Sequence, residues 1–134
     1  MVNFLAIIVA SVVSVLIAMF WYSSAVFGPH WMRLAGISKK DADAAKKKMA
    51  GSMIMGLVST FISFWALALI MESFLVAGIG TAILVGLLVW VGFVLTTTLS
   101  PVLWEGKSFT LYVLNNSYTL ISVVIGAIII GAWL

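Results

Sequence analysis

Four long apolar stretches dominate this chain of 134 residues. They cover residues 3–22, 49–71, 81–99 and 111–133. A helix needs about 20 apolar residues to cross the hydrocarbon core of a bilayer, and each stretch is close to that length. Because 64% of the residues are hydrophobic and only 8% are charged, the chain lacks the polar surface of a water-soluble domain. We therefore predict an all-α, membrane-embedded four-helix bundle, which forms one transmembrane domain over residues 1–134.

Two other interpretations of the apolar stretches fit less well. The strands of a membrane barrel alternate apolar and polar residues, whereas 125–134 is apolar on every face. A secretory signal peptide begins with cations and ends at a small-residue cleavage site. The first stretch has no Lys or Arg before Phe4 and ends in Trp21 and Tyr22. We expect this helix to be retained, so that four crossings run up, down, up and down.

The cations predict the orientation of the crossings. All seven Lys and Arg residues lie in two connections, 23–48 and 100–110. The positive-inside rule then places both connections in the cytoplasm and both termini outside. Attraction of the longer connection to anionic lipid head groups, worth about 1 kcal/mol per cation, accounts for the net charge without a nucleic-acid partner.

The connection 23–48 carries local folding signals. Gly28 and Pro29 are expected to end the first helix. Ser38 and Asp41 have the spacing of a capping box, which predicts a new helix. We expect that helix to run straight into the second crossing. Its charged first turns are interpreted as a solvated face among the head groups rather than as a binding site.

The two halves of the chain share a feature at the ends of the first and third crossings. Hydroxyl residues there precede an aromatic turn with glycine, SSAVFG at 23–28 and SPVLWEG at 100–106. One interpretation is a parallel repeat of two helical hairpins related by an axis along the membrane normal. The other is that two helix ends at the same interface share the same composition.

Polar side chains gather at the predicted cytoplasmic ends of all four crossings, which suggests a bundle open inward and sealed outward. Adjacent residues of a helix point about 100° apart, so at least one of Asn115 and Asn116 should face the bundle. Hydrogen bonding to the threonines at 96–98 is one account of these amides. A polar cavity is the other, and its candidate residues are Tyr22, His30, Thr97, Glu105, Asn115 and Asn116.

Signals for catalysis and cofactors are weak. His30 is the only histidine and the chain has no cysteine, so a tetrahedral metal site is not expected. The motifs of serine hydrolases, phosphate-binding loops and zinc proteases are missing from the sequence. His30 would titrate near neutral pH beside Glu105 if the two connections met, but a histidine at an interfacial helix break is usually only solvated, and we favour that interpretation. We expect no cofactor and no enzymatic activity; a lipid-directed enzyme using these two residues ranks third.

Small residues and buried tryptophans bear on assembly. Trp65 and Trp90 lie deep in their crossings and are expected to need partners inside the bundle. The pairs Ala82–Gly86 and Ser122–Gly126 have the spacing of close helix crossings. The leading hypothesis is therefore an accessory unit of a homo-oligomer or of a larger membrane complex. The alternative is a channel or facilitator for a small neutral solute.

The run WYSSAVFGPHWMRLAGIS at 21–38 resembles a bacterial family of small four-span membrane proteins that is classed as a domain of unknown function. Its members share a W-Y-S motif, a Phe-Gly pair and a W-M pair before a basic turn. These correspond here to 21–23, 27–28 and 31–32. The resemblance implies the four-span fold and a place in the bacterial cytoplasmic (inner) membrane. It implies no mechanism.

Overall fold

The computed structural model describes residues 1–133, which form helices and connecting turns without any strand. The elements in chain order are α1 (Phe4–Trp21), α2 (Gly28–Ala35), α3 (Lys39–Lys46), α4 (Met49–Ser73), α5 (Ile79–Val89), the π-helix η1 (Trp90–Leu95), the 3-10 helix η2 (Thr97–Leu99), α6 (Ser100–Trp104) and α7 (Phe109–Ala132). Four helical segments, α1, α4, Ile79–Trp104 and α7, are long and apolar enough to cross a membrane. The predicted all-α fold is confirmed.

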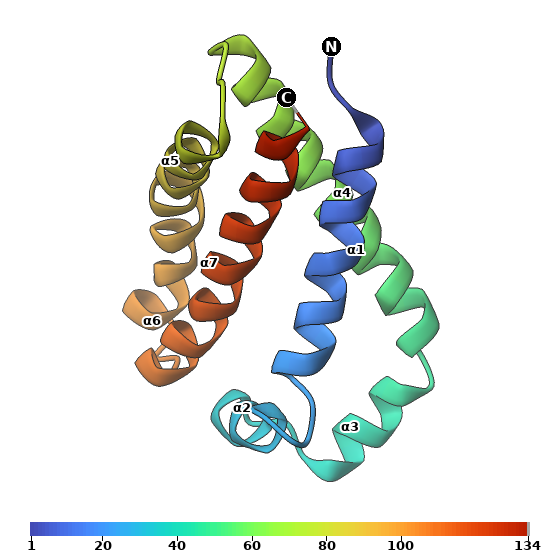
Figure 1. The fold of residues 1–134 in the computed structure, drawn as a ribbon. Coiled ribbons are helices and arrows are strands. Elements are labelled where there is room, and N and C mark those ends of the chain that lie inside the picture. The colour runs from blue at the N-terminus through green and yellow to red at the C-terminus, as the bar shows by residue number, and fades with distance from the viewer. Residues whose placement is uncertain (134) are drawn as a thin grey trace.

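Successive crossings run antiparallel, so both termini lie at one end of the molecule and α2, α3 and α6 lie at the other (Figure 1). We call these the terminal end and the cationic end, because the second carries all the Lys and Arg residues. α1 packs extensively against α4 and α7, and α7 also packs against α5, whereas α4 and α5 touch little. The hairpin of α1 and α4 therefore contacts the hairpin of α5 and α7 mainly through α1 and α7. This packing does not test the internal repeat, which stays a prediction.

The connection between α1 and α4 contains the predicted capping box. The Ser38 hydroxyl accepts the Asp41 N–H, and the Asp41 carboxylate accepts the Ser38 N–H, both at 3.1 Å. Hydrogen bonding to the Ser38 side chain, and then to its backbone, lowers the pKa of Asp41. The expectation of one helix running into the second crossing is wrong, because α3 ends at Lys46 and α4 begins at Met49. The break lets the charged α3 and the apolar α4 follow different axes.

The third crossing changes helical type along its length. It passes from α5 through a π-helix and a 3-10 turn into α6, and so continues to Trp104. The predicted loop from residue 100 is therefore wrong over residues 100–104. Such π segments are rare and often occur at functional sites. The Tyr112 hydroxyl donates to the Leu95 carbonyl at 2.5 Å, which ties the end of the π-helix to α7.

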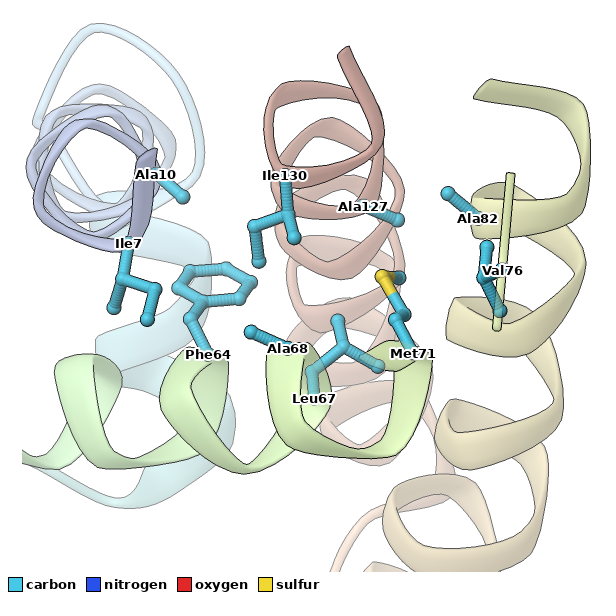
Figure 2. Packing of buried hydrophobic residues seen from close by; sticks show 10 residues of the cluster. All are labelled: Ile7, Ala10, Phe64, Leu67, Ala68, Met71, Val76, Ala82, Ala127 and Ile130. Atoms are coloured by element: carbon cyan, nitrogen blue, oxygen red, sulfur yellow. The ribbon is translucent and has the colours of Figure 1, made fainter. Parts of the chain in front are cut away.

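The apolar core lies toward the terminal end, because most of its residues come from the first turns of α1 and α5 and the later turns of α4 and α7. It consists of Ile7, Ala10, Phe64, Leu67, Ala68, Met71, Val76, Ala82, Ala127 and Ile130. Figure 2 shows how these side chains pack. Glycines permit the close approach of the helices. A Cβ at Gly131 would lie 2.6 Å from that of Ala82, and a Cβ at Gly86 would lie 3.0 Å from that of Ala127. Ala82 and Gly86 of α5 thus pack inside the chain, so this pair gives no support to an oligomer.

The two deep tryptophans differ in their surroundings. The Trp90 indole N–H donates to the Thr119 hydroxyl at 2.9 Å, so this tryptophan has a partner inside the bundle, as expected. Trp65 is 41% exposed on α4, and the expectation that it also needs an internal partner is wrong. An indole on an outer face can contact lipid instead of neighbouring helices.

Candidate functional site

A cavity of about 930 Å³ opens at the cationic end of the bundle. Its walls come from α2, from the end of the third crossing and from the first turns of α7. The residues that line it are Arg33, Leu34, Ala35, Gly36, Thr97, Thr98, Pro101, Val102, Gly106, Lys107, Ser108, Leu111, Tyr112, Asn115, Asn116 and Thr119. Amides, hydroxyls and two cations therefore share the walls with aliphatic side chains.

Asn116 is held in place by hydrogen bonds at the inner wall of the cavity. Its side chain is 4% exposed. Its Nδ2 donates to the Thr98 hydroxyl and to the Tyr112 carbonyl, each at 3.0 Å. Buried polar groups in proteins are normally satisfied in this way. The predicted bonding to the 96–98 threonines is present for Asn116, which bonds to Thr98 and so joins α7 to the third crossing.

Asn115 connects the cavity to α1. The Tyr22 hydroxyl donates to its Oδ1 at 2.7 Å, across 93 residues of chain. The Tyr22 ring meets Tyr118 and Trp31 edge to face, with centroids 5.7 and 5.4 Å apart. Among residues 1–133 the Nδ2 of Asn115 has no hydrogen-bond partner. Asn115 therefore keeps two donors available at a cavity wall.

Thr97 presents a different group to the cavity. Its hydroxyl donates to the Phe93 carbonyl at 2.6 Å, as hydroxyl side chains often do within helices. Because a hydroxyl has a single hydrogen, the Thr97 oxygen remains an acceptor. The 3-10 turn that begins at Thr97 places it beside Thr98 on the same wall.

His30 and Glu105 do not belong to the walls, contrary to the predicted cavity. His30 lies in the first turn of α2, where its Nδ1 is 2.6 Å from the Arg33 Nη2. Glu105 follows α6 and is exposed in the turn before α7. No hydrogen bond or ion pair joins the two in the part of the chain that the structure describes. The surrounding turns hold them on exposed surfaces, where solvation is their simplest role.

Of the six candidate residues, the structure therefore brings four together. Thr97, Asn115 and Asn116 line the cavity, and Tyr22 reaches it through Asn115. A family model described as "Protein of unknown function (DUF1761)" matches residues 5–131. The chain belongs to this family. No curated protein and no solved structure matches the chain.

The match to DUF1761 covers nearly the whole chain and includes every residue of the cavity wall. It confirms the resemblance to a family of unknown function. Within residues 1–133, the cavity has no group of three His, Cys, Asp or Glu side chains that could hold a metal ion. Its chemistry is that of hydrogen bonding and positive charge.

Several residues of the cavity wall could not be predicted from the sequence. The sequence explains Arg33 and Lys107 by membrane orientation and by attraction to lipid head groups, and it gives no separate signal for Ser108, Tyr112 or Thr119. One signal was available, because Arg33 and Lys107 are the two cations that lie outside the run 39–48. Their convergence on one cavity required the packing of α2 against α7.

Proposed function

We propose that this membrane protein is non-enzymatic and binds a small polar solute that enters its cavity from the cytoplasm, as a facilitator would. The observation that carries the proposal is the position of the polar cavity. The cavity, of about 930 Å³, lies at the cationic end of the bundle, whereas the apolar core lies toward the terminal end. Ligand sites in membrane proteins are commonly built from polar groups on facing helices.

The energetics of a membrane helix support a binding role for the cavity. A polar side chain within a crossing costs free energy unless it is paired or hydrated. Asn116 meets this requirement with protein partners, whereas the free Nδ2 of Asn115 meets it with water or a solute. The two neighbours thus divide a structural role and a ligand-binding role.

The non-enzymatic part of the proposal rests on the wall composition. His30 and Glu105, which would be the natural acid and base, both lie outside the walls. General acid–base catalysis needs such groups within hydrogen-bond reach of a substrate. The remaining hydroxyls bind and orient solutes without activation by a neighbouring base.

A liposome assay tests the proposed function. Purified protein in liposomes should accelerate the entry of a small polar solute such as glycerol, followed by stopped-flow light scattering. Asn115→Leu with Thr97→Leu should abolish the acceleration. Ser63→Leu is the matched control, because the Ser63 hydroxyl is exposed on α4 and bonds to its own helix. Equal entry rates for protein-free liposomes, wild type and both variants, over a panel of polar solutes, would remove the proposal.

A second candidate function, assembly into a homo-oligomer, is favoured by α4. Residues 49–59 are exposed, although they belong to an apolar crossing. Gly51 and Gly56 have open space around them, and Ser52 with Gly56 has the small-residue spacing of close helix contacts. Gly56→Leu should weaken self-association in detergent, measured by sedimentation equilibrium. A wild-type protein that is monomeric at every concentration would exclude this function.

A further inference from the structure

We infer that the cavity binds the phosphate group of an anion, held by Arg33, Lys107 and the free amide of Asn115. This inference rests on the proposed binding function and names its ligand class. It replaces the neutral solute of the sequence-based hypothesis with a charged one. The phosphate group can belong to the head of an anionic lipid or to a free phosphate ester, because both present the same oxygens to the site.

The charge of the wall is the first argument. Two of the lining residues are cations and none is an acid. Arg33 comes from α2 and Lys107 from the turn before α7, so two separate elements direct positive charge to one cavity. Neither forms an ion pair with a carboxylate among residues 1–133, where the ion pairs are Met1 with Glu72 and Asp43 with Lys46. A site lined by one sign of charge concentrates the opposite ion.

The hydrogen-bond capacity of the wall is the second argument. Arginine only donates, so Arg33 gives one N–H to the His30 Nδ1 and retains its other donors. The Ser108 hydroxyl accepts the Leu111 N–H at 3.2 Å and still has its hydrogen to donate. Together with the Asn115 Nδ2, these groups supply donors from α2, from the turn before α7 and from α7 itself. Planar guanidinium groups match the geometry of phosphate oxygens well.

The helix ends at the cavity add to the same field. α7 begins at the wall after Ser108, and a helix N-terminus carries partial positive charge. α2 ends at the wall with the opposite partial charge. However, the Gly36 and Ile37 N–H groups bond to the Arg33 and Met32 carbonyls at 3.3 and 2.9 Å, which satisfies two of its terminal acceptors. The cations and donors therefore determine the sign of the site.

The location and size of the cavity allow both sources of the phosphate group. Leu34, Val102 and Leu111 give it an apolar wall, which would contact the glycerol or upper acyl part of a lipid. Its volume of about 930 Å³ also accommodates a free phosphate ester with water around it. The experiment must therefore separate a lipid from a soluble ligand.

Binding is tested with the purified full chain in nanodiscs made of phosphatidylcholine. In one arm, inorganic phosphate and glycerol 3-phosphate are titrated while thermal unfolding is followed by tryptophan fluorescence. In the other arm, phosphatidylglycerol is added to the nanodiscs, and the lipid retained by the protein is identified by native mass spectrometry. A stabilisation or a preferential retention that saturates is the expected result in at least one arm, and the responding arm identifies the source.

The variant R33Q/K107Q should weaken that binding about tenfold or more, since charge-assisted hydrogen bonds are the strong ones. Both residues are exposed, so the fold should persist, which circular dichroism checks. The control K40Q/K47Q removes the same net charge from exposed lysines outside the cavity and should bind like wild type. The single variant Arg33→Lys keeps the charge but loses the guanidinium geometry, and should fall between wild type and R33Q/K107Q.

Two results overturn the inference. One is the lack of any saturable anion binding in both arms, and the other is an equal loss in R33Q/K107Q and K40Q/K47Q, which would indicate only diffuse surface attraction. The liposome assay then shows which proposal has failed. If polar solutes still enter in an Asn115-dependent way while no anion binds, the anion inference fails alone. If neither is seen, the proposed function fails with it.

Discussion

Replacing Gly126 by alanine should disrupt the contact between α7 and α4. Gly126 is buried in α7, and a Cβ at this position would overlap the ring of Phe64. Phe64 is itself 3% exposed within the core, so its ring has little free space to enter. Gly56 offers the matched control. It also lies within a long helix, but within one chain a Cβ added there meets nothing within 4 Å, so it serves as the control for the monomeric protein.

The magnitude follows from two opposing contributions. Adding a methyl group to a well-packed core costs about 1–3 kcal/mol. Replacing a mid-helix glycine by alanine returns about 0.5–1 kcal/mol through helix propensity. Gly126→Ala should therefore lower the free energy of unfolding by an amount between about 0 and 2.5 kcal/mol. Gly56→Ala should raise it by up to about 1 kcal/mol, because only the second contribution applies.

The assay is reversible unfolding in mixed micelles with increasing dodecyl sulfate, followed by tryptophan fluorescence. The difference between the two variants isolates the packing contribution, because the propensity contribution is common to both. Phe64→Leu in the Gly126→Ala background should restore part of the loss, so that the two substitutions are not additive. Equal stability of Gly126→Ala and Gly56→Ala would refute the described packing of α4 on α7.

Three further predictions address the connection, the cavity and the membrane orientation. The pKa of Asp41 is lowered in the folded state, so its contribution to α3 is present at neutral pH. It should be lost as the pH falls from the ordinary aspartate value of about 3.9 through the lower folded value. Backbone amide shifts of α3 should follow this titration, and Asp41→Asn should abolish it. Tyr22→Phe removes the bond to Asn115 and should cost about 0.6 kcal/mol in the same unfolding assay, the average for interhelical bonds in a membrane; no measurable cost would mean that the bond is replaced by water. When an impermeant thiol reagent is added to intact cells, it should label the cysteine of the Ala77→Cys variant and leave the cysteine of the Lys47→Cys variant unlabelled. The opposite pattern would invert the predicted orientation.

Local sequence signals predicted much of the architecture. The number of crossings follows from the length of apolar runs, which depends on composition alone. The collection of cations at one end follows from their positions in two connections. The capping box follows from the three-residue spacing of Ser38 and Asp41. Each of these features depends on residues that are near one another in the chain, so no knowledge of the packing was needed.

The candidate site was predictable only in part. The 96–98 threonines and the asparagines of the fourth crossing could be expected to meet, because polar groups in lipid need partners. The Tyr22–Asn115 bond depends instead on the packing of α1 against α7. The change to a π-helix at Trp90 had no clear sequence signal either, since its residues are as apolar as those before it.

The sequence alone thus specifies that the chain forms four apolar crossings, with the cations gathered at one end. These properties depend only on the composition of short segments of the chain. Tertiary structure alone establishes the order in which the crossings pack and the convergence of Arg33 and Lys107 on one cavity. The physical reason is that these crossings are apolar on nearly all faces. Such a helix has no distinct apolar face in its sequence that would indicate which helix it packs against. In lipid the hydrophobic effect does not favour one helix pair over another. Fit between small residues and rings, as at Gly126 and Phe64, makes that choice instead.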